Sequence, residues 1–364
     1  MLMFGKGDKD NPPHEEEYFY IEVPGEQKGQ EFLEGACLSL FFNCCVFYII
    51  GSESGEKGGV TMRTAGKRKK ARETIQGYLF VAPLFLFFLV FTAIPVIVTL
   101  FYLGFTKYNI MNNPKWIGIA NFKRIFQDPS IPQVAWNVIR LPMFLVPAHV
   151  VCSLLLAYGV YRIKNRYFKY VCRTAIYFPA ITTTASVSIA WGYLFNKDLG
   201  VFNWVLEKLG IISEGIPWLT SSNYAMTAIV IFSIWKFSGL HFLYYLIGFE
   251  NIPVSYYEAA RMDGAGEWTL FRKIVLPLLT PSIFYVLLTT MIGTMQAFDE
   301  PYFLTHGGPG DNTRTVAMFI YEKAFQSYDM GYASAVAALL FLAVFTLTAL
   351  QLYWQKGWVN YDYE

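Results

Sequence analysis

The sequence predicts an all-α membrane protein that crosses the bilayer with six helices. Apolar residues make up 54% of the chain and charged residues only 15%, whereas soluble domains carry roughly 25% charged residues. Six stretches stay apolar over the roughly 20 residues that a helix needs to span a bilayer. They are residues 77–105, 134–161, 170–195, 224–249, 278–304 and 331–354. Several contain prolines, which membrane helices tolerate because neighbouring helices satisfy the freed carbonyl groups.

Residues 1–61 differ in composition from everything that follows. They contain an acidic run at 15–17, and their one apolar patch, at 36–50, is short for a span and has no basic residues directly before it. That patch fits neither a transmembrane helix nor a signal peptide. Because a basic tail at 62–76 leads into the first span, we expect translation to start at Met62. Residues 1–61 are then a non-native or disordered extension; the alternative is a genuine disordered or membrane-surface segment.

The loops between the spans carry their basic residues unevenly. From Met62 onward, fifteen Lys and Arg residues fall on the side of the basic tail and eight on the opposite side. The richer side of a membrane protein is the cytoplasmic side. We therefore expect both chain ends, including the tail at 356–364, and the loop at 251–277 to lie in the cytoplasm, with a transmembrane domain at 77–355.

This cytoplasmic loop predicts a helical hairpin outside the bilayer. Ser255 and Glu258 have the spacing of a capping box, in which the serine caps a helix and the glutamate returns to the serine amide. Gly264 can end that helix in a left-handed conformation. Residues 267–274 then form a second short helix that is expected to end before Pro277.

The residue order of this hairpin resembles the EAA loop of bacterial binding-protein-dependent ABC importer permeases. The matching residues are Glu258, Ala259, Ala260, Arg261, Asp263, Gly264, Ala265, Phe271 and Pro277. Segments near 173–179, 235–239 and 298–313 extend the resemblance over roughly 70–360 and to the sugar-permease class, which includes maltose and glycerol-3-phosphate permeases. One departure is His306, which stands between a threonine and the Gly-Gly-Pro turn.

The resemblance implies a type I importer permease fold in a bacterial cytoplasmic (inner) membrane, with the hairpin as cytoplasmic coupling helices. It also implies four kinds of partner: a second homologous permease, two cytoplasmic ATP-binding subunits, an extracytoplasmic solute-binding protein and the lipid bilayer. The solute implied by the sugar-permease class is a carbohydrate.

No enzyme or nucleic-acid-binding pattern competes with this interpretation. The glycine-rich segment at 51–58 lacks the register of a phosphate loop, because Glu56 stands where the second glycine belongs. The four histidines and five cysteines show no metal-ligand spacing. We therefore expect no catalytic residue, metal or cofactor in this chain, with ATP hydrolysis on separate subunits.

Polar and aromatic residues inside the spans are the candidates for contact with the solute. Polar groups within a bilayer are costly unless they face the bundle interior or an aqueous cavity, and sugar sites commonly pair amides or carboxylates with a flat aromatic ring. The candidates are Asn137, Trp235, Gln296, Phe298 and Asp299. The alternative for each of them is a structural role between helices or at the membrane interface.

An ion-gradient-driven secondary transporter is the alternative function. Such transporters favour intramembrane carboxylates or broken helices at the midplane, together with an inverted repeat. Here Asp299 and Glu300 lie at the end of a span, and the sequence shows no repeat. Arg140 and Lys236 give no clear phosphate site, so we expect a neutral carbohydrate as the solute.

Overall fold

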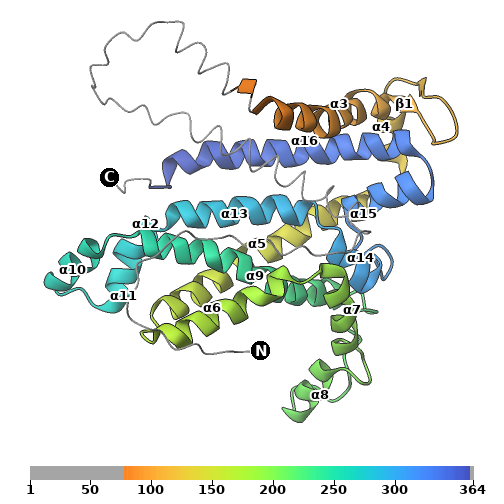
Figure 1. Ribbon diagram of the computed structural model, residues 1–364. Coiled ribbons are helices and arrows are strands. Elements are labelled where there is room, and N and C mark those ends of the chain that lie inside the picture. Colours follow the sequence, from red (N-terminus) through yellow and green to blue (C-terminus); the bar gives the residue numbers. More distant parts are fainter. Residues whose placement is uncertain (1–77, 80, 361–364) are drawn as a thin grey trace, which may run out of the picture. The chain divides into compact units, whose positions relative to one another are not determined.

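The part of the chain that the structure describes is predominantly helical (Figure 1). The computed structural model describes residues 78–360 except residue 80, all within one compact unit. The expectations for residues 1–61 and 62–76, and for the last residues of the tail at 356–364, lie outside the described residues.

The described elements follow one another from α3 to α16. The α-helices are α3 (Ile94–Phe101), α4 (Ala120–Gln127), α5 (Ile131–Tyr161), α6 (Arg166–Ile181), α7 (Thr184–Leu194), α8 (Val201–Lys208), α9 (Ala225–Asn251), α10 (Val254–Met262), α11 (Glu267–Leu270), α12 (Leu276–Leu278), α13 (Thr280–Met295), α14 (Asp299–Thr305), α15 (Val316–Tyr321) and α16 (Met330–Trp354). The π-helical turns are η1 (Leu89–Ala93), η3 (Phe271–Val275) and η4 (Glu322–Gln326), and the 3-10 turns are η2 (Leu103–Phe105) and η5 (Gln355–Gly357). The strands β1 (Thr106–Lys107) and β2 (Lys115–Trp116) pair antiparallel.

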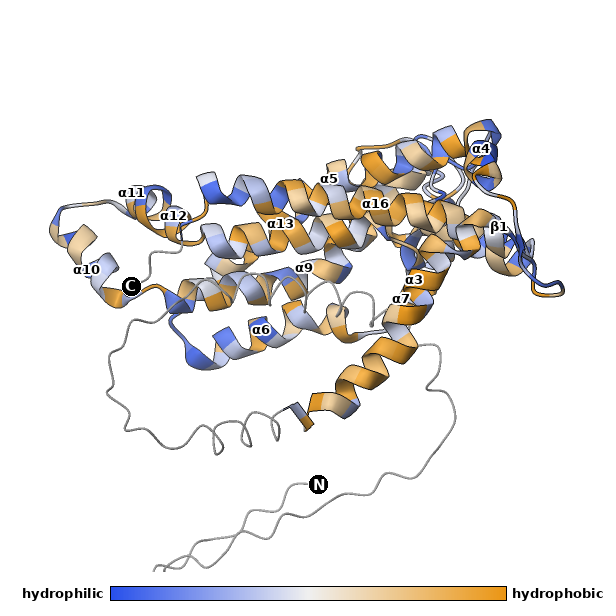
Figure 2. Ribbon diagram, turned by 90° about the horizontal axis from the view of Figure 1, so that it is seen from above, coloured by the Kyte–Doolittle hydropathy of each residue, from blue (hydrophilic) through white to orange (hydrophobic). Residues whose placement is uncertain are grey.

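In the described part of the chain, four helices are long and apolar enough to cross a membrane. They are Val81–Phe105, Ile131–Tyr161, Ala225–Asn251 and Met330–Gly357. These helices confirm the first, second, fourth and sixth expected spans. Figure 2 shows hydrophobic residues along α3, α13 and α16, with hydrophilic residues gathered in the α10–α11 hairpin and around α4. The apolar middle and polar ends match the segregation that a bilayer imposes.

The third expected span, 170–195, is divided into α6 and α7 by a break at Thr182 and Thr183. Neither helix reaches the roughly 20 residues needed to cross a bilayer alone. The Nζ of Lys236, from α9, donates to the Pro179 carbonyl at 2.7 Å and also to the Thr182 carbonyl. Backbone groups freed inside a membrane need such partners, so the buried lysine stabilises the break.

The fifth expected span, 278–304, is interrupted at both ends of α13. The helical segment Glu267–Leu278 is bent by 62° from α13, and the Thr280 hydroxyl closes the bend by donating to the Pro277 carbonyl at 2.7 Å. Residues 296–298 separate α13 from α14. The span is therefore α13, a short non-helical break, and α14.

Helix α9 is the centre of the bundle. It packs against α5, α6 and α13 and also contacts α7 and α14. α16 packs against α3, α4 and α13. About half of the residues of α9 are buried, whereas very few residues of the helix Val81–Phe105 are buried, so the first span lies at the periphery of the bundle.

Candidate functional site

The end of α10 is a Schellman turn built around Gly264. Ala265 donates its amide to the Ala260 carbonyl at 2.9 Å, and Gly264 donates to the Arg261 carbonyl at 3.1 Å, which are the two hydrogen bonds of that motif. Gly264 has a φ of +76°, which confirms the left-handed conformation predicted for it. A Cβ added there would meet no atom within 4 Å. The backbone conformation, and not close packing, therefore requires this glycine.

The start of α10 and the second helix differ from the sequence prediction. α10 begins at Val254 after Pro253, and no side chain caps it. The predicted capping box of Ser255 and Glu258 is therefore wrong, because Ser255 already lies inside the first turn. The second helix also continues through η3 into α12 instead of ending before Pro277. Pro277 directly follows the π-helical turn η3, in the first turn of α12.

Glu267 links the two halves of the hairpin to the end of α5. Its carboxylate lies 3.6 Å from Arg261 Nη2 and 3.1 Å from the Nη2 of Arg162. The three side chains are about half exposed, so each pair contributes at most about 1 kcal/mol to stability. Their main effect is to orient the hairpin. Arg162 and Glu267 were not predicted, because the helix packing that brings them together leaves no local pattern in the sequence.

One side of the hairpin joins the core of the bundle. Ala260 and Leu270 belong to a buried hydrophobic cluster that also contains Phe249 of α9. Phe271 is half-buried, and its ring centroid lies 4.7 Å from that of Tyr158 on α5. Close-packed contacts of this kind transmit displacement instead of absorbing it. The hairpin is thus packed directly against α5 and α9.

Other residues of the hairpin present apolar side chains to the outside. Met262 is 88% exposed, Trp268 is 70% exposed and Val254 is 68% exposed. Large exposed apolar groups surrounded by polar residues mark interaction surfaces. Of the residues predicted for coupling, Ala260 is buried, Ala265, Phe271 and Pro277 are half-buried, and Glu258, Ala259, Arg261, Asp263 and Gly264 are exposed.

Three predicted pathway residues meet at the break between α13 and α14. Gln296 follows the last residue of α13, and Phe298 precedes Asp299, the first residue of α14. The Phe298 ring stacks on Tyr302 with centroids 5.0 Å apart and meets Tyr321 edge-on at 5.3 Å. A broken helix offers backbone polar groups beside this aromatic surface. Such a combination of polar groups and flat rings suits a carbohydrate.

Asn137 and Trp235, the other two predicted pathway residues, have different partners. Asn137 is fully buried, and its amide donates to the backbone carbonyls of Asp311 and Arg314, both at 2.9 Å. Both amide hydrogens thus hold the loop that follows α14. Trp235 packs against Trp191 with ring centroids 5.0 Å apart. In this structure both residues therefore make contacts that fit the alternative, a structural role between helices.

A buried polar cluster inside the bundle was not predicted. His149 of α5 and His241 of α9 meet edge-on with ring centroids 4.9 Å apart. The Thr290 hydroxyl of α13 lies 3.2 Å from His241 Nε2, and the Ser238 hydroxyl lies 3.5 Å from His149 Nδ1. Buried polar groups in a membrane bundle often line a pathway. No sequence pattern signals this cluster, because three separate helices supply it.

The comparisons with known proteins agree on one family. The family model described as "Binding-protein-dependent transport system inner membrane component" matches residues 149–357. The chain is 34% identical over 282 residues to the lactose transport system permease protein LacF of Rhizobium radiobacter, over 77% of this chain and 93% of that protein. It is 36% identical over 240 residues to the sulfoquinovosyl glycerol transport system permease protein SmoG of Agrobacterium fabrum, over 65% of this chain and 76% of that protein.

A solved structure shows the same fold. A chain of the bacterial alginate ABC transporter, in complex with an alginate pentasaccharide-bound periplasmic protein, aligns with a TM-score of 0.68 at 19% identity. The alignment covers 79% of this chain and 96% of that chain. The described helices therefore have the arrangement of an ABC importer permease.

Proposed function

Because the chain belongs to the binding-protein-dependent transport system inner membrane component family of ABC importer permeases, we propose that it is the membrane subunit of an ATP-driven carbohydrate importer. With a second homologous permease it forms a pathway through a bacterial cytoplasmic membrane. Two cytoplasmic ATP-binding subunits supply the energy, and an extracytoplasmic binding protein delivers the solute. The relatives LacF and SmoG are named as lactose and sulfoquinovosyl glycerol permeases, which supports a carbohydrate or glycoside as the solute.

The hairpin of α10 and α11 is the proposed docking element for the ATP-binding subunits. The observation that carries this proposal is its two-sided construction: Met262 and Trp268 are exposed, whereas Ala260 and Leu270 are anchored in the bundle core. The exposed side offers apolar area to a partner, and the anchored side passes movement onward. The remaining coupling residues, Glu258, Ala259, Arg261, Asp263, Gly264, Ala265, Phe271 and Pro277, complete this surface and its support.

The proposed mechanism is alternating access driven by the hairpin. Closure of the ATP-bound subunits displaces the segment Glu267–Leu278, which meets α13 at the 62° bend. α13 then carries the displacement to the break at 296–298. One rigid helix thus connects the proposed docking element to the proposed solute contacts.

Gln296, Phe298 and Asp299 are the proposed solute contacts, with Asn137 and Trp235 holding the structure around them. We propose a neutral carbohydrate as the solute. The two intramembrane cations already have partners: Arg140 Nη1 donates to Asn312 Oδ1 at 3.2 Å, and Lys236 holds the α6–α7 break. A solute-loaded binding protein is proposed to dock on the loops at 105–133, 196–222 and 305–330.

The test is co-expression of the chain with the subunits encoded beside it, followed by purification and reconstitution into liposomes. We expect ATP-binding subunits to co-purify, and uptake to require both ATP and the solute-loaded binding protein. Trp268→Ser should reduce the co-purified ATP-binding subunits and uptake together. Trp354→Ser is the matched control, because Trp354 is 65% exposed at the end of α16 and lies outside both the hairpin and the loops proposed for the binding protein. Uptake driven by an ion gradient without ATP would refute the proposal in favour of a secondary transporter.

A further inference from the structure

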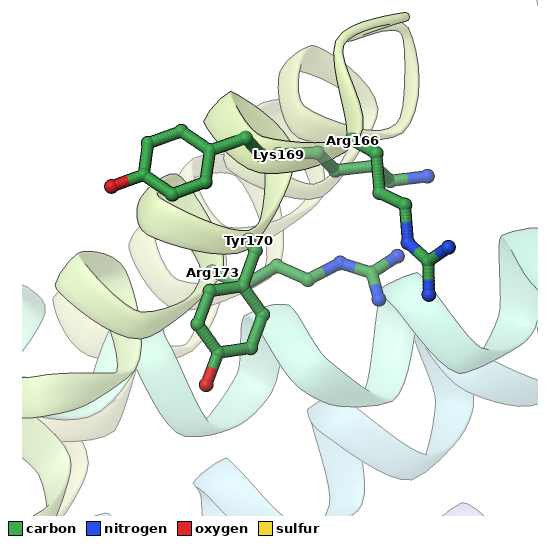
Figure 3. Close-up of a pocket in the computed structure, with 5 residues that line it drawn as sticks. Arg166, Lys169, Tyr170 and Arg173 are labelled. Carbon is green, nitrogen blue, oxygen red and sulfur yellow. The ribbon is translucent and has the colours of Figure 1, made fainter. Parts of the chain in front are cut away.

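A pocket along the first half of α6 gathers basic and aromatic side chains. It has a volume of about 720 Å³ and is lined by Arg166, Tyr167, Lys169, Tyr170 and Arg173. Figure 3 shows the charged ends of Arg166, Lys169 and Arg173 on one side of α6, with the Tyr170 ring pointing away from them. The spacing of the three cations, about one and two helical turns, places them on one face of the helix.

The pocket holds more positive charge than its neighbours neutralise. Arg173 pairs with Glu250 of α9, but its Nε is buried without a hydrogen-bond partner. Among the described residues, Arg166 and Lys169 form no ion pair. Lys169 instead lies 5.4 Å over the ring of Tyr161. Three cations thus face one carboxylate, which leaves the site electrostatically suited to an anion.

The basic residues of the adjacent hairpin are arranged differently. Arg162 and Arg261 both pair with the carboxylate of Glu267. These two arginines thus share one acidic partner, whereas Arg166 and Lys169 have no acidic partner among the described residues.

The residues around the pocket resemble the part of a membrane helix that lies beside lipid headgroups. α6 packs chiefly against α9, and beyond Arg173 its residues Phe178 and Ile181 remain exposed. Basic side chains followed by exposed aromatic and aliphatic ones along a helix are typical of the step from headgroups to acyl chains. Basic pockets beside membrane helices on the cytoplasmic side bind anionic lipid headgroups.

We propose that this pocket binds the phosphate of an anionic phospholipid in the cytoplasmic leaflet. The Arg166 and Arg173 guanidinium groups offer planar paired donors that match phosphate oxygens, and Lys169 adds a point charge. The acyl chains would lie along the exposed apolar residues of α6. Only the choice of leaflet rests on the proposed function and its topology; phosphate binding rests on the pocket itself.

The test measures lipid retained by the purified chain together with its partner subunits. The complex is mixed in detergent with phosphatidylglycerol or phosphatidylcholine and analysed by native mass spectrometry. We expect phosphatidylglycerol to be retained at least fivefold more than phosphatidylcholine, and increasing salt to reduce this preference. The double variant Arg166→Gln/Lys169→Gln should abolish the preference. Lys164 is exposed in the loop just before α6 and does not line the pocket. The control variant Lys164→Gln should therefore leave the preference unchanged.

Several outcomes would overturn the proposal. One is equal retention of the two lipids by the wild-type complex; another is an undiminished preference in the double variant. Displacement of the lipid by millimolar inorganic phosphate would identify a site for the free anion. Retention by the isolated chain but not by the complex would show that an acidic surface of a partner subunit occupies the pocket. Lipid retention is measured without transport. A failure of the lipid proposal can therefore be distinguished from a failure of the proposed ATP-driven uptake.

Discussion

Replacing Gly264 by valine tests whether the left-handed turn at the end of α10 serves coupling. Gly264 has a φ of +76°, a conformation that a β-branched residue adopts only as an outlier. Gly266 offers a matched control, since its φ of −69° and ψ of 160° suit any residue. Neither position has an atom within 4 Å of an added Cβ. The two valine variants therefore differ chiefly in backbone strain.

The size of the effect follows from that strain. A left-handed conformation costs a non-glycine residue about 1–2 kcal/mol, and no steric clash within the chain adds to it. Such a cost lowers the population of the native turn by roughly 5- to 30-fold relative to a competing turn. Loss of the turn releases the hydrogen bond from Ala265 to Ala260 and redirects α11. We therefore expect uptake and co-purified ATP-binding subunits to fall at least severalfold in Gly264→Val.

The assay compares both variants with the wild-type complex in three measurements. These are ATP-dependent uptake, the amount of co-purified ATP-binding subunits, and thermal unfolding of the chain in detergent. Gly266→Val should resemble the wild type in all three. Gly264→Val should unfold at nearly the wild-type temperature, because the hairpin lies outside the membrane-spanning helices. Normal uptake with full ATP-binding subunit content in Gly264→Val would refute the coupling assignment.

Three further predictions concern other contacts. Lys236→Met should lower the thermal unfolding temperature, because the Pro179 carbonyl loses a buried donor at a cost of about 1–3 kcal/mol; an unchanged temperature would contradict the role of the lysine at the α6–α7 break. Glu267→Gln should reduce uptake while the loss of both ion pairs costs at most about 2 kcal/mol of stability, and unaltered uptake would contradict it. Burial raises the pKa of Asp128, but a backbone amide, the Tyr332 hydroxyl and two nearby cations together lower this pKa below its usual value. The stability contributed by Asp128 is therefore complete above about pH 4 and is lost as the pH falls further; thermal unfolding in Asp128→Asn should lack this acid dependence.

The membrane helices were predictable because hydrophobicity and length are properties of the local sequence. The expected span at 134–161 corresponds to α5, which begins at Ile131 and ends at Tyr161. The break between α6 and α7 was not placed, because it depends on Lys236, a residue of another helix. Local patterns therefore locate a span, and tertiary contacts decide whether it is continuous.

In the candidate site, too, local features could be predicted from the sequence and tertiary contacts could not. The left-handed turn at Gly264 follows from local backbone chemistry, and the sequence placed it correctly. The cap at Ser255 was misplaced because Pro253 is the N-cap of α10, two residues earlier than the capping-box pattern suggests. The contact between His149 and His241 has no local signature, since it arises only when α5 packs on α9.

The two interruptions flanking α13 explain how a small movement outside the membrane can reach the middle of the bundle. A continuous, straight helix from Glu267 to Thr305 would distribute a displacement along its whole length. In the proposed mechanism, the 62° bend before α13 converts a shift of the hairpin into a tilt of α13. The non-helical residues 296–298 then let α14 keep its contacts with α7 and α9. The proposed mechanism therefore concentrates relative motion at the break, where Gln296, Phe298 and the first residue of α14 meet. This arrangement ties the proposed solute contacts to the position of the hairpin.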